Sequence, residues 1–112
     1  MADLRRRLGA WLAAQGAERE ELEDIVLAVH EAAMNVVEHA YGPEDAELTV
    51  VASRGDDGIE VVVADRGSWR EPRDPHRGRG HAIMSAVMDE VTIDTGPRGS
   101  TVRLRRRLAD PE

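Results

Sequence analysis

Residues 22–41 read LEDIVLAVHEAAMNVVEHAY, and this stretch decides the fold. Its apolar residues recur at the three-to-four-residue spacing of an amphipathic helix: Leu22, Ile25, Val26, Val29, Ala33, Val36, Val37 and Ala40. The pair Gly42-Pro43 ends the pattern. The spacing therefore predicts a long helix from about Glu18 to Ala40.

The polar side of this helix carries groups that suit phosphoryl chemistry. Glu31, Asn35 and Glu38 lie about one turn apart, on the face opposite the apolar stripe. A carboxylate such as Glu31 can act as a general base, and an amide oxygen such as that of Asn35 can bind Mg²⁺. An ordinary solvated helix face would show the same pattern, so the spacing alone leaves both interpretations open.

The rest of the chain predicts a small sheet and two further helices. Asp3 can cap a first helix that begins at Leu4 and stops at Gly16. The remaining predicted elements are strands Leu48–Ser53 and Ile59–Ala64, a short helix Ala82–Met88, and strands Val91–Thr95 and Ser100–Arg107. This order predicts an α+β two-layer sandwich, with one mixed or antiparallel sheet covered on one face by helices.

Length and composition limit the classes of protein. The 112 residues suffice for one domain, so residues 1–112 are expected to form a single domain, and the net charge is −7. Cysteine is absent, which excludes thiol catalysis and Cys-ligated zinc. All 15 basic residues are arginine, so P-loop and Schiff-base chemistry, which need lysine, are excluded too. No apolar run is long enough to span a bilayer, and a cytoplasmic location is expected.

Two further segments resemble parts of a nucleotide site. Asp65 ends a buried-looking strand and precedes Gly67; such a carboxylate accepts hydrogen bonds only, and can select an exocyclic amine such as that of adenine. Gly78-Arg79-Gly80 lies directly before the short helix, where backbone N–H groups and the helix dipole favour a phosphate. An Asp followed by Gly at the end of a strand is often only a turn, and a lone Gly-x-Gly is a weak signal for a phosphate.

The order of these segments resembles that of one superfamily. The four sequence boxes of the Bergerat-fold ATPases, called N, G1, G2 and G3, are matched in order by Glu31-x-x-x-Asn35, Asp65-x-Gly67, Gly78-x-Gly80 and Gly99-Ser100-Thr101. Within that superfamily, residues 29–41 are similar to the helix of the anti-sigma-factor serine/threonine-protein kinases, in an actinobacterial-like branch. The resemblance runs from about Leu4 to Leu108.

The resemblance implies a role for each matched residue. Glu31 corresponds to the catalytic base and Asn35 to the Mg²⁺ ligand. The expected ATP-binding residues are Asn35, Asp65, Gly67, Gly78, Gly80, His81 and Thr101, with Thr101 assisting Asp65 at the adenine from the neighbouring strand. Arg5 corresponds to an arginine near the nucleotide and the partner surface.

The implied function is that of an anti-sigma-factor serine-protein kinase. Such a protein binds ATP and Mg²⁺, sequesters an alternative sigma factor, and phosphorylates a serine of a STAS-domain anti-anti-sigma partner. No direct contact with DNA or membrane is expected.

Two departures from the family pattern are present. Trp69 stands where the G1 box has its second glycine, which motivates an alternative function: a nucleotide-dependent sigma- or STAS-binding module without phosphotransfer. The family's edge strand before the first helix is missing, as it would be in a chain excised from a larger multidomain protein. A homodimer or contact with adjacent domains is therefore expected.

A third hypothesis belongs to another class. Strand alternation places Arg103, Arg105 and Arg107 on one face, so an arginine-rich adaptor that contacts nucleic acid is conceivable. A solvated sheet face explains the same pattern.

Overall fold

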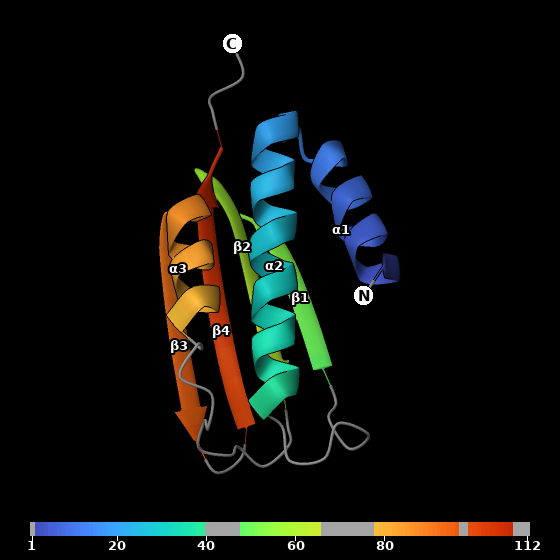
Figure 1. Cartoon of the computed structure of the whole chain (residues 1–112). Coiled ribbons are helices and arrows are strands. Elements are labelled where there is room, and N and C mark those ends of the chain that lie inside the picture. Colours follow the sequence, from blue (N-terminus) through green and yellow to red (C-terminus); the bar gives the residue numbers. More distant parts are fainter. Residues whose placement is uncertain (1, 40–47, 66–77, 97–98, 109–112) are drawn as a thin grey trace.

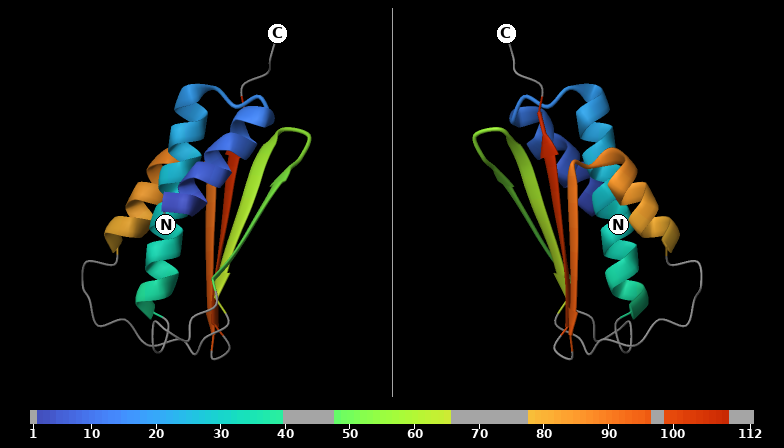
Figure 2. Two further views of the ribbon diagram at one scale, coloured as in Figure 1. Left: turned by 90° about the vertical axis from the view of Figure 1, so that its right-hand side faces the viewer. Right: turned by 90° about the vertical axis from the view of Figure 1, so that its left-hand side faces the viewer.

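The computed structural model describes residues 2–39, 48–65, 78–96 and 99–108. Three helices lie on one face of a single sheet, which confirms the predicted α+β two-layer sandwich (Figures 1 and 2). The elements are α1 (Ala2–Ala14), α2 (Arg19–His39), β1 (Leu48–Arg54), β2 (Gly58–Asp65), α3 (Gly78–Val87), β3 (Glu90–Gly96) and β4 (Gly99–Arg107).

The sheet is antiparallel throughout, with the strand order β1-β2-β4-β3. The chain leaves β2, passes through α3, forms β3 at one edge, and returns as β4 between β3 and β2. Among the described strands, β1 and β3 are therefore the edges.

The core lies between the sheet and the helices. Alternate residues of the two central strands face inward and are buried, as Val61, Val63, Val102 and Leu104 show. The helices contribute Leu8, Leu12, Ile25, Ala28, Val29, Ala32, Ala33 and Met84 to the same cluster, and Met88, directly after α3, joins them. The other face of the sheet carries the exposed side chains of Arg103, Arg105 and Arg107, as the alternation predicted.

The turn between α1 and α2 forms as the sequence indicates. Gly16 has a φ of 86°, a left-handed conformation that glycine adopts without strain. Its N–H bonds the carbonyl of Ala13 at 3.1 Å, and the N–H of Ala17 bonds that of Leu12 at 3.1 Å, which is a Schellman ending. The Glu21 carboxylate then accepts the N–H of Glu18 at 2.8 Å just before α2 begins.

The buried face of α2 differs from the predicted stripe. Ala28 and Ala32 are fully buried, whereas Leu22 and Val26 are only partly buried. On a wheel of 100° per residue, the buried face is rotated by roughly 50° towards the side of Glu31 and Asn35. The cause is tertiary, because α1 and α3 flank α2 on opposite sides (Figure 1).

Helix α3 begins four residues earlier than predicted. Gly78, Arg79 and Gly80 form its first turn, although a loop was expected there. Two glycines disfavour a helix by about 1 kcal/mol each relative to alanine, so local propensity gave the wrong boundary. No helix in the described part of the chain is long and apolar enough to cross a membrane.

Candidate functional site

The matched sequence segments converge at one end of the molecule. Helix α2 and strand β2 finish at this end, and α3 and β4 begin near it (Figure 1). Residues that are more than 60 positions apart in sequence, such as Asn35 and Ser100, thus lie towards the same end of the fold.

The register of β2 and β4 defines the sheet side of the site. Asp65 pairs with Ser100, and Ala64 pairs with Thr101. Residues paired across an antiparallel ladder share a face, so position 65 shares the face of Ser100 rather than that of Thr101. Ser100 is 5% exposed and has the parity of the buried Val102, which faces the helices.

Thr101 therefore lies on the other face of the sheet. Its side chain is half-buried and has the parity of the exposed Arg103. The neighbouring strand was predicted correctly, but the register does not support the expected contribution of Thr101 beside Asp65. Ser100 is the residue that shares the face of position 65. Strand parity could have indicated this, because Ser100, not Thr101, alternates with the apolar positions 102 and 104.

The Ser100 hydroxyl is a buried polar group. Its Oγ has no hydrogen-bond partner among the described residues. A buried hydroxyl that makes no hydrogen bond costs about 1–3 kcal/mol, so natural folds seldom keep one without a reason. A ligand that reached the Ser100 end of β4 would satisfy it.

Helix α2 forms the opposite side of the site. Glu31 is half-buried, which is closer to the core than the predicted fully outward face. Asn35 follows one turn later, about 6 Å along the axis. The side chains of Asn35 and Glu38 lie outside the described residues, as do those of Asp65 and His81.

The beginning of α3 supplies backbone donors. The first four N–H groups of a helix have no partner within it, and here they belong to residues 78–81. Gly78, Gly80 and His81 thus remain suited to hold an anion, from within the first helical turn rather than before it. Gly67 and Trp69 lie outside the described residues.

Arg5 lies on the other flank of α2. It lines a groove of about 290 Å³ between α1 and α2, together with Leu22, Glu23, Val26, Leu27 and His30. This groove shares no residue with the Asp65–Ser100 pair, so the described residues do not bring Arg5 to the sheet side of the site.

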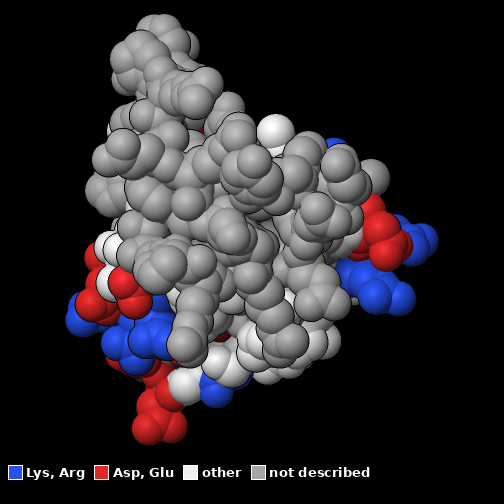
Figure 3. Space-filling view, turned by 90° about the horizontal axis from the view of Figure 1, so that it is seen from below, with Lys and Arg blue, Asp and Glu red and all other residues white. Residues whose placement is uncertain are grey.

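The remaining properties of this end of the molecule are its charge distribution and its metal ligands. Seen from the end that holds the matched segments, the described arginine and acidic side chains occur together on both flanks (Figure 3). Among the described residues, no group of three or more His, Asp or Glu side chains could hold a metal ion. The side chain of Asn35, the predicted Mg²⁺ ligand, is not among those described, so this absence does not bear on it.

Residues 1–106 match the family described as histidine kinase-like ATPase domain. The chain belongs to this ATPase family. Within the family it is similar to the serine-protein kinases RsbW, the anti-sigma-factor kinase branch that the sequence resembles. It is 32% identical to RsbW of Bacillus pumilus over 125 aligned positions, which cover 94% of this chain and 76% of that protein.

Two other similarities extend this result. The chain is 30% identical to RsbW of Bacillus mycoides over 95 residues, and there it spans 59% of the relative's length. The crystal structure of the RsbU and RsbW domains of a Mycobacterium tuberculosis protein superposes with a TM-score of 0.80 at 31% identity, covering 98% of this chain and 29% of that one. The fold of this ATPase family is therefore shown over nearly the whole chain.

Proposed function

We propose that this domain is an anti-sigma-factor serine-protein kinase. It binds ATP with Mg²⁺, sequesters an alternative sigma factor, and phosphorylates a serine of a STAS-domain antagonist. The family match and the name of the RsbW relatives support this function. The observation that carries it is the unpartnered, buried hydroxyl of Ser100 in register with Asp65.

The adenine is read by these two residues. The Asp65 carboxylate accepts a hydrogen bond from the exocyclic amine, and the Ser100 hydroxyl can donate to a ring nitrogen or accept from a bridging water. Ser100 thus replaces Thr101 as the second adenine-side residue. Thr101 has no direct role in this proposal.

The phosphates extend from the sheet towards the helices. The N–H groups of Gly78, Gly80 and His81 hold them at the start of α3. Gly67 is the further residue that this proposal assigns to ATP binding. Asn35 would hold Mg²⁺ there, and the ion would supply neutralising charge at the phosphates.

Glu31 is the catalytic base. Its carboxylate takes the proton from the partner's serine hydroxyl as that oxygen bonds to the γ-phosphorus, and ADP leaves with the electrons of the broken bond. The phosphoserine formed adds about −1.5 to −2 charges, which would weaken the complex with this acidic domain.

Arg5 contributes to the partner surface. A homodimer or contact with a neighbouring domain would cover the β1 edge.

A phosphotransfer assay tests this function. The domain is incubated with γ-labelled ATP, Mg²⁺ and a purified STAS-domain protein, beside a Glu31→Gln variant. We expect label on the STAS protein, and at least about a 100-fold loss of rate in the variant with nucleotide affinity kept.

The same assay separates the alternative function. Nucleotide binding without any transfer from the unaltered domain would support the sigma- or STAS-binding module that Trp69 motivates. Equal transfer by the Glu31→Gln variant would instead remove Glu31 from the mechanism.

A further inference from the structure

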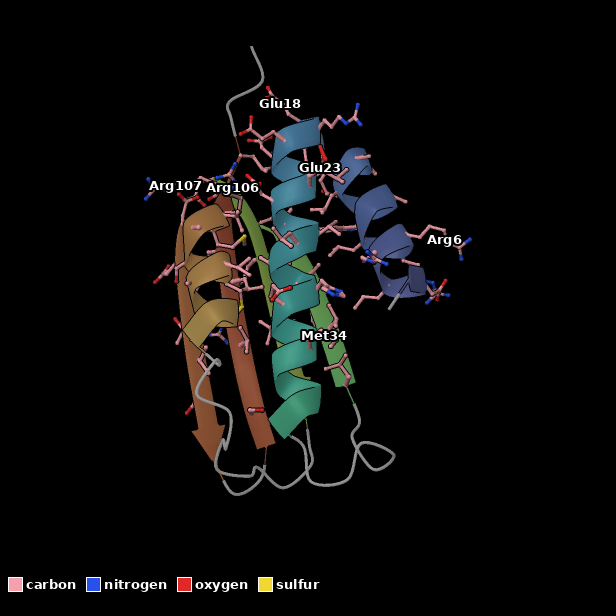
Figure 4. The ribbon with its side chains drawn as sticks, viewed as in Figure 1. Arg6, Glu18, Glu23, Met34, Arg106 and Arg107 are labelled. Carbon is pink, nitrogen blue, oxygen red and sulfur yellow. The ribbon has the colours of Figure 1, made fainter. Side chains whose placement is uncertain are left out.

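An ion pair joins the helix layer to the sheet. Arg106, near the end of β4, donates from Nη2 to the Asp24 Oδ2 on α2 at 3.1 Å. The two side chains are 24% and 25% exposed, so the pair is largely buried. Figure 4 shows Arg106 beside the N-terminal half of α2, at the end of the molecule opposite the nucleotide side.

This pair differs from the other ion pairs of the described residues. Asp3 with Arg6 and Arg7, and Arg19 with Glu23, connect residues within one helix. Arg105 connects to Glu60 and Glu90 within the sheet. Arg106–Asp24, in contrast, joins β4 of the sheet to helix α2.

Three alanines, Ala28, Ala32 and Ala33, lie on the buried face of α2 near the site, together with the larger Val29. Helices keep their axial position when bulky side chains form ridges that fit the grooves of a neighbour, and methyl groups form shallow ridges. A polar contact of defined geometry can then set the position of the helix along its axis.

The pair is not arranged for maximal stability. The Arg106 Nε is buried and has no hydrogen-bond partner among the described residues. A buried ion pair with incomplete hydrogen bonding contributes little net stability, and the best-attested use of such groups is to fix register.

We propose that Arg106 and Asp24 form a positioning pair that sets where α2 lies along the sheet. Asp24 precedes Glu31 by seven residues, or two turns and about 10 Å of the same helix. The pair thereby fixes Glu31 and Asn35 relative to the Asp65–Ser100 pair. This inference rests on the proposed function for its catalytic meaning, since a shift of about 1 Å can cost up to 100-fold in rate.

Distance measurement tests the placement directly. The chain has no cysteine, so two spin labels can be placed by Met34→Cys on α2 and Val51→Cys on β1, which are 47% and 56% exposed. Electron–electron resonance distances are compared before and after Arg106→Met. The matched control is Arg105→Met, since Arg105 is the neighbouring arginine of β4 but pairs only within the sheet.

We expect Arg106→Met to shift or broaden the label distance and Arg105→Met to leave it unchanged. Asp24→Asn should act like Arg106→Met, and serves in its place if that variant does not fold. The charge exchange Asp24→Arg with Arg106→Asp should restore the original distance. An unchanged distance in both Arg106→Met and Asp24→Asn would overturn the proposal.

Nucleotide affinity supplies the functional readout. We expect Arg106→Met to lower the affinity for Mg·ATP about tenfold, because Asn35 moves with α2. The affinity for ADP in EDTA should change less than threefold, because the adenine is bound by residues of the sheet. Equal weakening of both nucleotides would indicate a merely structural role. If the unaltered domain binds no nucleotide, the proposed function fails, while the distance measurement still decides the placement.

Discussion

At the residue scale, Ser100 is the informative position. Its neighbour Thr101 also carries a hydroxyl and lies one residue away, yet the two side chains lie on opposite faces of the sheet. The side that each faces depends on how β4 pairs with β2, which is a non-local property. The sequence motif Gly99-Ser100-Thr101 could not by itself distinguish them.

The Ser100 hydroxyl predicts that its removal stabilises the nucleotide-free domain but weakens nucleotide binding. Ser100→Ala should raise the free energy of unfolding of the nucleotide-free domain by about 1 kcal/mol, because the cost of burying an unpaired hydroxyl is removed. Thermal and urea denaturation measure this. The control is Ser53→Ala at an exposed position of β1, which should change stability by less than about 0.5 kcal/mol. A loss of more than about 1 kcal/mol in Ser100→Ala would show that the hydroxyl has a structural partner.

At the element scale, most of the fold was predictable. The long apolar stripe of α2, the Gly16 ending of α1 and the alternation of β2 are local patterns, and the structure confirms these elements within one or two residues. The start of α3 and the burial of Ala28 and Ala32 were missed. Both depend on helices packing beside one another, which no local pattern contains.

The β1–β2 hairpin gives a prediction at this scale. A Cβ on Gly58 would lie 2.2 Å from the carbonyl oxygen of Arg106, whereas one on Gly55 would meet nothing closer than 3.9 Å. Gly58→Ala should therefore lower the free energy of unfolding by about 2–3 kcal/mol, because backbone must move to admit the methyl group.

Gly55→Ala is the matched control in the same turn. It should change the free energy of unfolding by less than about 0.5 kcal/mol in urea denaturation. Equal losses in the two variants would mean that the close approach of β2 to β4 is not what requires glycine at position 58.

At the scale of the whole molecule, charge argues against nucleic-acid binding. The net charge is −7, and Arg105 on the outer sheet face is paired with Glu60 and Glu90. We expect no detectable binding of duplex DNA at about 50 mM salt in fluorescence anisotropy. Binding that falls steeply with salt, and that weakens on replacing Arg103 and Arg107, would instead favour the arginine-rich adaptor.

The whole fold also explains why the candidate site could be only partly predicted. The order of the four boxes indicated which segments contribute, and all of the described ones reach one end of the molecule (Figure 1). The rotation of α2 and the parity of β4 determine which side chains of those segments face inward. These are consequences of packing three helices on one antiparallel sheet. The sequence therefore placed Glu31 too far from the core and did not indicate that Ser100 faces inward.

The most direct test of the central claim is calorimetric titration of this domain with Mg·ATP. We predict micromolar binding, its loss in Asp65→Asn, about a tenfold weakening in Ser100→Ala, and no change in Thr101→Ala, because only residues 65 and 100 share the helix-facing side. Absence of binding at millimolar ATP, or a weakening by Thr101→Ala that exceeds that by Ser100→Ala, would contradict the account.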